Sequence, residues 1–197
     1  GLPMCLLPVQ PIMIQILLHL QNEWCNQPHE SYAVIDLEGL AHHKGSAFGH
    51  LGQEKQPSQE MFENLLGLEL FNNKDKTIII EDESQRIGLV MLPTIFFQYL
   101  RKQDCYYIKI PFESRLDFII KGYGAFDKTE LIAAITRIQK RLGGLETKNA
   151  IEAVEQNDIV TAFGILLKYY DKWYEKERKI IYFESERVDP DLNASLF

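Results

Sequence analysis

The chain has 197 residues, a formal net charge of −7 and a composition of 46% hydrophobic and 25% charged residues. These values suit one soluble globular domain of ordinary size with a single core. The acidic balance excludes a molecule that as a whole attracts nucleic acid or an anionic membrane. The three cysteines, Cys5, Cys25 and Cys105, form no CxxC pair, which disfavours a zinc site or a disulfide framework and favours a reducing cytoplasm.

The charge is distributed unevenly along the chain. The segment from Asp127 to Lys179 holds ten Lys or Arg residues against nine Asp or Glu, whereas the remainder holds eleven against nineteen. We therefore expect any polyanion to meet the C-terminal half first.

Residues 1–20 contain no Lys, Arg, Asp or Glu and three prolines, Pro3, Pro8 and Pro11. The segment lacks the basic start of a signal peptide, and it is too short and too interrupted by proline to span a membrane. We interpret its start as irregular chain and Ile12–Leu20 as a buried helix. A loop over Trp24–Glu30 then leads into a strand at Tyr32–Leu37.

That strand opens the most informative stretch, Val34–Gly49. An apolar pair, Val34-Ile35, gives way to Asp36 and Glu38, and a loop with two histidines, a lysine and glycines follows. A buried strand that delivers acids at its carboxyl end, before a glycine-bearing loop, is how open α/β sheets present ligand-binding groups. The alternative is a strand that simply leaves the core for a polar surface loop.

A second strand, Thr77–Ile80, also ends in polar residues, Glu81-Asp82-Glu83-Ser84. An apolar strand that ends in acids is the pattern of a Walker B element, whose carboxylate holds Mg²⁺ beside nucleotide phosphates. The alternative is a solvated strand end. Two neighbouring parallel strands would bring Asp36 and Glu38 to the same edge as Glu81 and Asp82.

Helices are expected around these strands. Ser58 is a candidate N-cap for a helix whose apolar residues predict one buried face. These residues are Met61, Phe62, Leu65, Leu66 and Leu68. A helix over Leu92–Lys102, with Pro93 in its first turn, precedes a strand at Tyr106–Ile110. A further helix after Pro111 carries Arg115, for which pairing with a nearby acid is the commoner fate.

The C-terminal half is predicted to be helical. Asp127 and Glu130 form a capping box for a helix that ends at Gly143-Gly144. Its basic residues, Arg137, Lys140 and Arg141, suit either a phosphate backbone or a solvated helix face. Helices follow over residues 148–154 and 158–177. The second carries an aromatic stripe that is more typical of a core than of a base-stacking platform, and Ile180–Phe183 reads as a last strand.

Taken together, these segments resemble the bacterial tRNA 2-selenouridine synthases, which join a rhodanese-like domain to a P-loop NTPase-like domain. The resemblance rests on six segments in the family's order: DLEGLAHHKGSAFG (36–49), QPSQEMFENLL (56–66), IIIEDESQRIG (78–88), IPFESRLDFIIKGYG (110–124), RIQKRLGG (137–144) and LLKYYDKWYEK (166–176). It covers most of residues 33–183. The resemblance implies a P-loop NTPase-like α/β fold, an open parallel sheet with a helical C-terminal part.

The resemblance also implies a reaction on the wobble uridine of certain tRNAs. A 2-thiouridine is first S-geranylated with geranyl diphosphate, and selenium from selenophosphate then displaces the geranylthio group to give 2-selenouridine. The implied partners are such a tRNA and these two co-substrates. A separate rhodanese-like chain is a further candidate partner. We expect Mg²⁺ as the bound ion and no tightly bound organic cofactor. We also expect a cytoplasmic protein that does not bind a membrane.

Two sets of residues are candidates for the site. Those for a diphosphate or Mg²⁺ are Asp36, Glu38, His43, Lys44, Gly45, Ser46, Glu81, Asp82, Ser84 and Arg86. Those for the tRNA backbone are Arg115, Arg137, Lys140 and Arg141. Lys44 stands where the family usually has arginine, which would weaken any bidentate contact.

The sequence departs from the family at its start. No rhodanese cysteine loop is found, and the stretch that corresponds to the Walker A loop, roughly Leu6–Gln15, contains no Gly, Lys, Ser or Thr, although a phosphate cradle needs them. We interpret residues 1–32 as a diverged, frameshifted or truncated segment. Residues 33–125 are then the α/β core, 126–185 its helical part with a final strand, and 186–197 a loose tail. A non-catalytic tRNA-binding remnant and a generic P-loop NTPase or kinase are the alternatives.

Overall fold

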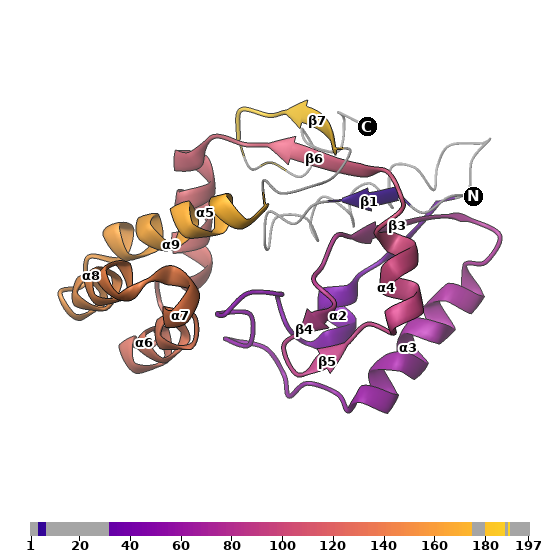
Figure 1. Cartoon of the computed structure of the whole chain (residues 1–197), viewed down its shortest axis with the longest axis horizontal. Coiled ribbons are helices and arrows are strands. Elements are labelled where there is room, and N and C mark those ends of the chain that lie inside the picture. The colour runs from indigo at the N-terminus through magenta and orange to yellow at the C-terminus, as the bar shows by residue number, and fades with distance from the viewer. Residues whose placement is uncertain (1–3, 7–31, 175–179, 188, 190–197) are drawn as a thin grey trace. The chain divides into compact units, whose positions relative to one another are not determined.

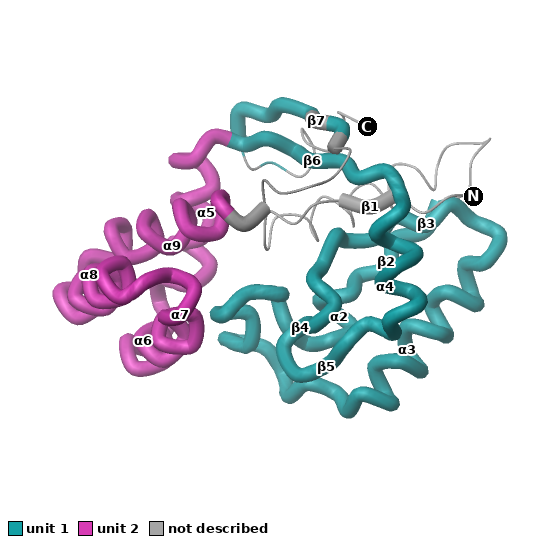
Figure 2. The backbone as a smooth tube through the Cα atoms, viewed as in Figure 1, with its two compact units in different colours: residues 1–110, 179–197 teal, residues 111–178 magenta. Residues whose placement is uncertain are grey.

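The structure, a computed structural model, describes residues 4–6, 32–174, 180–187 and 189. The chain forms two compact units, one of residues 1–110 with 179–197 and one of residues 111–178 (Figure 2). The predicted helix at Ile12–Leu20, the loop at Trp24–Glu30 and most of the Walker A counterpart lie outside the described residues.

The first unit is built on a parallel sheet of five strands (Figure 1). These are β1 (Met4–Leu6), β2 (Tyr32–Ile35), β3 (Thr77–Glu81), β6 (Cys105–Lys109) and β7 (Ile180–Glu184), in the order β2-β3-β1-β6-β7. All four pairings are parallel, as the short apolar runs predict. The expected strands at β2, β3, β6 and β7 are therefore confirmed.

One strand contradicts its prediction. Met4–Leu6 lies between β3 and β6 in the sheet, where irregular chain was expected. Three residues are too few to carry a periodic signal, and only the two neighbouring strands, which are distant in sequence, supply the hydrogen-bonding partners that make them a strand.

Three helices and a hairpin complete the described part of this unit. The helices are α2 (Leu37–Ala41), α3 (Gln59–Asn72) and α4 (Thr94–Leu100). Ser58 caps α3 as predicted, because its side chain accepts a hydrogen bond from the backbone N–H of Met61. The hairpin of β4 (Arg86–Ile87) and β5 (Val90–Met91) was not predicted, since two-residue strands have no periodicity to detect.

The predicted core face of α3 is only partly correct. Phe62 and Leu66 are fully buried, but Met61 is 52% exposed and Leu68 is 54% exposed. The buried pair and the exposed pair both fit the helical spacing of the predicted apolar face. The sequence pattern alone therefore did not show which of these residues would be buried.

The second unit is helical throughout its described residues. It contains α5 (Phe112–Tyr123), α6 (Lys128–Arg137), α7 (Gln139–Leu142), α8 (Gly144–Glu155) and α9 (Ile159–Tyr174). Asp127 caps α6 by accepting a hydrogen bond from Thr129 N. The single helix expected up to Gly143 is instead divided at Ile138. Phe163 and Tyr169 of the aromatic stripe are buried, which supports the core interpretation.

No helix among the described residues has both the length and the apolar character that a bilayer crossing requires.

Candidate acidic site at the carboxyl end of the sheet

The two acid-tipped strands, β2 and β3, are neighbours in the sheet, as the sequence predicts. Ile35 is paired with Ile80, so the next residues, Asp36 and Glu81, reach the carboxyl edge side by side. Parallel strands place their carboxyl ends at one edge, which is where open α/β sheets bind ligands.

Asp36 and Glu81 both hold the start of α2. Asp36 is its N-cap and accepts a hydrogen bond from Gly39 N at 2.6 Å, while Glu81 Oε2 accepts one from Leu37 N at 2.7 Å. They thereby satisfy two of the backbone N–H groups that a helix start leaves without partners. Leu37 therefore begins a helix, and its assignment to the strand in the sequence analysis was wrong.

Three glutamates lie buried behind this edge, and we call Glu38, Glu81 and Glu83 the carboxyl cluster. Their exposed fractions are 4%, 1% and 4%. The Oε1 atom of each is buried, with no hydrogen-bond donor in the described part of the chain. The carboxyls of Glu38 and Glu83 lie close together, because a Cβ atom placed on Gly45 would meet both of them, and two such buried carboxyls can hydrogen-bond only if one of them carries a proton.

The environment of the cluster favours protonated carboxyls. Burial, followed by the nearby charges of Glu83 and Glu81, raises the pKa of Glu38 to about 10. Burial also raises the pKa of Glu83, although its hydrogen bonds to Glu38 and to the Ser84 backbone act in the opposite direction. Burial and the charge of Asp36 raise the pKa of Glu81. Like charges in a desolvated site hold protons rather than ionise together.

The glycine-bearing loop after α2 packs directly onto the cluster. Gly45 has φ +61°, and a Cβ atom placed on it would lie 2.5 Å from Glu83 Oε1 and 2.8 Å from Glu38 Oε1. Both the left-handed backbone and the close approach exclude a side chain at this position. The carboxyl cluster therefore explains why the loop has glycine at position 45.

His43 of the same loop is enclosed by two further glycines. A Cβ atom on Gly49 would lie 2.8 Å from His43 Cε1, and one on Gly88 would lie 2.6 Å from His43 Cδ2. His43 is 8% exposed. This burial makes a packing role for His43 the simpler account, beside the anion-binding role that the sequence suggests.

The other predicted anion ligands of the site have local partners. Ser46 Oγ accepts a hydrogen bond from Phe48 N, and Ser84 Oγ donates one to Arg86 O. Arg86 is exposed, with Nη2 3.4 Å from Met91 Sδ. Lys44 is half-buried.

Gln56 connects this loop region to the hairpin, a role that the sequence did not indicate. Its Nε2 donates to Ala41 O at 2.9 Å and to Ile87 O at 3.1 Å, and its Oε1 accepts from Leu89 N at 2.8 Å. One side chain therefore fixes the end of α2 against the β4–β5 turn.

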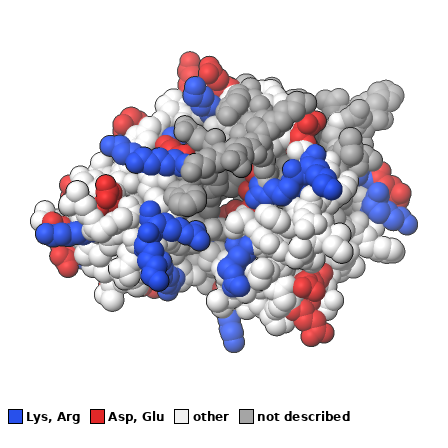
Figure 3. All heavy atoms as spheres, in the orientation of Figure 1, with Lys and Arg blue, Asp and Glu red and all other residues white. Residues whose placement is uncertain are grey.

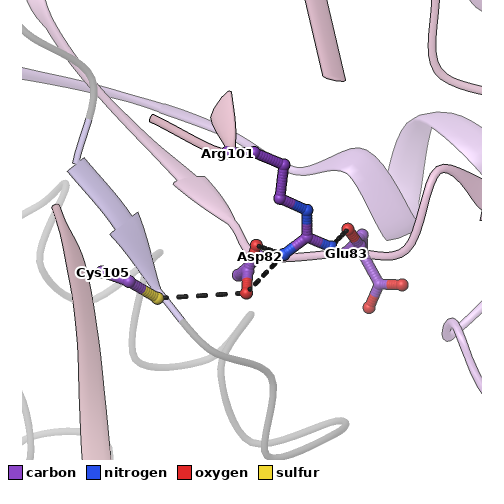
Figure 4. Close-up of polar contacts among 4 residues, drawn as sticks. All are labelled: Asp82, Glu83, Arg101 and Cys105. Carbon is purple, nitrogen blue, oxygen red and sulfur yellow. Dashed lines mark hydrogen bonds and ion pairs between the residues drawn. The ribbon is translucent and has the colours of Figure 1, made fainter. Parts of the chain in front are cut away.

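Asp82, the residue that follows β3, is paired with an arginine (Figure 4). Arg101 Nη1 lies 2.9 and 3.2 Å from the two Asp82 carboxylate oxygens, and Arg101 Nη2 donates to Glu83 O. Cys105 Sγ lies 3.9 Å from Asp82 Oδ2. Asp82 is thus the one acid of this edge whose charge is neutralised by a cation in the described structure.

The sequence analysis missed both Glu83 and Arg101 as members of this site. Glu83 stands in the polar run after β3, so the run itself was the available signal. Arg101 lies 19 residues from Asp82 at the end of α4, and no short motif connects the two.

Carboxylate oxygens are the ligands that Mg²⁺ prefers, and the cluster is of the right chemical type. In the segments that the structure describes, however, no group of three or more His, Cys, Asp or Glu side chains is arranged to hold a metal ion. Mg²⁺ binding stays a prediction, and no step of the mechanism is assigned to it.

The predicted tRNA-contacting residues are all in the second unit. Arg115 is buried and makes a bidentate ion pair with Asp171 at 2.6 and 3.0 Å, which is the alternative given for it in the sequence analysis. Arg137, Lys140 and Arg141 are exposed, and Arg141 lies close enough to Tyr169 to hydrogen-bond. Lys and Arg side chains are prominent on the surface drawn in Figure 3.

Comparison with known proteins decides the family. Residues 25–185 match the family model described as the tRNA 2-selenouridine synthase AAA domain. The chain belongs to this family. A domain of this type and the parallel sheet together confirm the predicted P-loop NTPase-like α/β fold.

Individual relatives carry the same name. The chain is 31% identical over 191 residues to the tRNA 2-selenouridine synthase of Shewanella piezotolerans, covering 78% of this chain and 52% of that protein. It is 33% identical over 176 residues to that of Shewanella pealeana (72% and 47%) and 42% identical over 97 residues to that of Nitrosomonas europaea (47% and 25%). The chain spans about half the length of the Shewanella relatives.

Proposed function

We propose that this chain is the AAA part of a tRNA 2-selenouridine synthase, which converts wobble 2-thiouridine through S-geranyl-2-thiouridine to 2-selenouridine. The observation that carries the proposal is the family membership of residues 25–185. The acid-tipped strands with the signature loop packed over them support it further, because they form the ligand-presenting edge that such a domain requires.

The first unit is proposed to handle the diphosphate of geranyl diphosphate and the selenophosphate. Lys44 provides a cation next to Gly45 in the loop after α2, and its ammonium group can bind phosphate as a point charge. The carboxyl cluster then has a positioning role, since its members hold α2 and the loop from below. Mg²⁺, if bound, would compensate phosphate charge at this edge.

The second unit is proposed to contact the tRNA backbone through Arg137, Lys140 and Arg141. These side chains are exposed on consecutive turns of α6 and α7. Arg115 is left out of this set, because its guanidinium is already bound by Asp171. Backbone contacts of this kind supply affinity that falls with salt.

A rhodanese-like partner is proposed to supply the selenium-transferring cysteine. A second candidate is a non-catalytic tRNA-binding chain, which the absence of Gly, Lys, Ser and Thr from Leu6–Gln15 favours. A generic NTPase or kinase is disfavoured by the same residues.

The first test is binding of an anticodon stem-loop that carries 2-thiouridine, measured by fluorescence anisotropy at several salt concentrations. We expect tighter binding than to the unmodified stem-loop, and an affinity that falls as salt rises. The combined variant Arg137→Ala, Lys140→Ala, Arg141→Ala should weaken binding by about tenfold or more and reduce the salt slope by about three.

A matched control removes three other exposed lysines of the same unit, Lys121, Lys148 and Lys172, and should change binding much less. Equal losses in both variants would show a non-specific charge effect and contradict the assigned surface. Loss of the geranyl group from a geranylated stem-loop, with selenophosphate and with or without a rhodanese-like chain, then separates catalysis from binding alone. No turnover under either condition would favour the non-catalytic candidate.

A further inference from the structure

Helix α3 carries an apolar stripe on the side opposite its buried residues. Met61, Leu68 and Phe71 are 52%, 54% and 68% exposed, whereas Phe62 and Leu66 are buried. With the exposed Asn64 between them, positions 61, 64, 68 and 71 follow the alternating spacing of three and four residues that forms the seam between paired helices. We call these four residues the α3 stripe.

A glycine lies beside this stripe in the middle of the helix. Gly67 is exposed, and a Cβ atom placed on it would meet nothing within 4 Å. Glycine within a helix is less stable than alanine by about 0.5–1 kcal/mol, and the described part of the unit contains no group that requires its small size. A second helix that packs closely against α3 would require it.

The ends of the stripe carry opposite charges. Glu60 lies in the first turn of α3, and Lys74 follows its end, with Nζ 5.3 Å from the centre of the Phe71 ring. The two residues are equally distant in sequence from Gly67. An antiparallel copy of α3 centred on Gly67 therefore brings Glu60 of each protomer opposite Lys74 of its partner, whereas a parallel copy sets like charges together.

We propose that two copies of this chain associate through the α3 stripe, antiparallel, with Gly67 near the twofold axis. The surface is self-complementary in charge, as a twofold interface between identical chains requires. This association is independent of the proposed catalytic function, because none of its residues belongs to the acidic site or to the tRNA-contacting set.

Sedimentation velocity on the full chain over a range of concentrations tests the proposal. We expect the mass to rise from that of the 22.9 kDa chain towards twice that value. Leu68→Glu should raise the dimer Kd by about tenfold or more, as for a buried apolar anchor. The matched control is Ile95→Glu, on α4, where the side chain is 83% exposed; it should leave Kd unchanged. Circular dichroism verifies that both variants are folded.

Two further variants separate association from folding. Gly67→Ala should raise the stability of the monomer but weaken the dimer. Gly122→Ala, at an exposed position of α5 where a Cβ atom also meets nothing, should raise stability alone. Glu60→Lys should weaken the dimer, and the exchange Glu60→Lys with Lys74→Glu should restore it. A chain that stays monomeric at every concentration overturns the proposal, and so does a dimer that Leu68→Glu leaves intact. A stripe that binds a different protein instead of a second copy would give the first of these results.

Discussion

The carboxyl cluster of the first unit and the Arg115–Asp171 pair of the second bury ionisable side chains in opposite ways. In the first unit, Glu38, Glu81 and Glu83 lie together, and their burial raises the pKa of each. In the second unit, Arg115 is buried with one opposite charge, Asp171, in a bidentate pair. In an ion pair each buried charge is compensated by its partner. Like charges that are buried together oppose folding unless they hold protons or bind a ligand.

This contrast separates the candidate site from a structural ion pair. Perturbed carboxyls concentrate at sites where a protein performs chemistry or binds ions, and here they lie under the signature loop at the carboxyl end of the sheet. Arg115 shows that a basic residue in a recognisable motif can instead hold helices together. The difference can be tested by breaking each arrangement in turn.

The largest effect is expected from a side chain at Gly45. Gly45→Val combines a left-handed backbone with an overlap against the carboxyls of Glu83 and Glu38, so it should lower the free energy of unfolding by about 4 kcal/mol. Urea unfolding measures the change. Gly122→Val is the control for valine in place of glycine at an open helical position and should cost much less. Equal losses would mean that the loop does not rest on the cluster.

The next effect is a pH dependence that the carboxyl cluster imposes. The pKa of Glu83 is raised to about 7 and that of Glu38 to about 10, from an ordinary value of 4.5. The native state thus holds protons that the unfolded chain releases above pH 4.5. The stability from Glu83 is complete below that pH and is lost as pH rises towards 7, by about 3 kcal/mol, and the loss from Glu38 continues towards pH 10.

Urea unfolding from pH 5 to pH 9 measures this slope. Glu83→Gln, which cannot ionise, should reduce this slope between pH 5 and pH 7 and leave the part that Glu38 contributes. Glu130→Gln, at an exposed position of α6, is the matched control and should leave the slope as it is. A wild-type stability that rises over the same pH range would contradict the assigned direction.

A smaller effect is expected from the paired arginine. Arg115→Ala leaves Asp171 without its partner and should lower stability by about 2 kcal/mol. This is below the loss for a fully buried pair, because the Asp171 side chain is 35% exposed. The double variant with Asp171→Ala should lose less than the sum of the two single variants. Lys148→Ala, which removes an exposed pair with Glu152, should change stability by less than about 0.5 kcal/mol.

Much of the sheet was predictable because its strands are short apolar runs between turns. Once β2 and β3 are neighbours, the meeting of Asp36 and Glu81 follows from the rule that parallel strands share a carboxyl edge. The burial of α3 was overestimated at Met61 and Leu68, since an amphipathic period identifies a face and not the surface that covers it.

The sequence by itself determined the family, the signature loop, the acid-tipped strands and the helix start at Ser58. Each of these features depends on residues that are close together in the sequence. Only the tertiary structure decided that β1 exists, that Glu83 completes a buried carboxyl cluster, that Arg101 neutralises Asp82 and that Arg115 pairs with Asp171. Each of these contacts joins residues between 19 and 100 positions apart, and their energies depend on burial, which no local pattern of residues records.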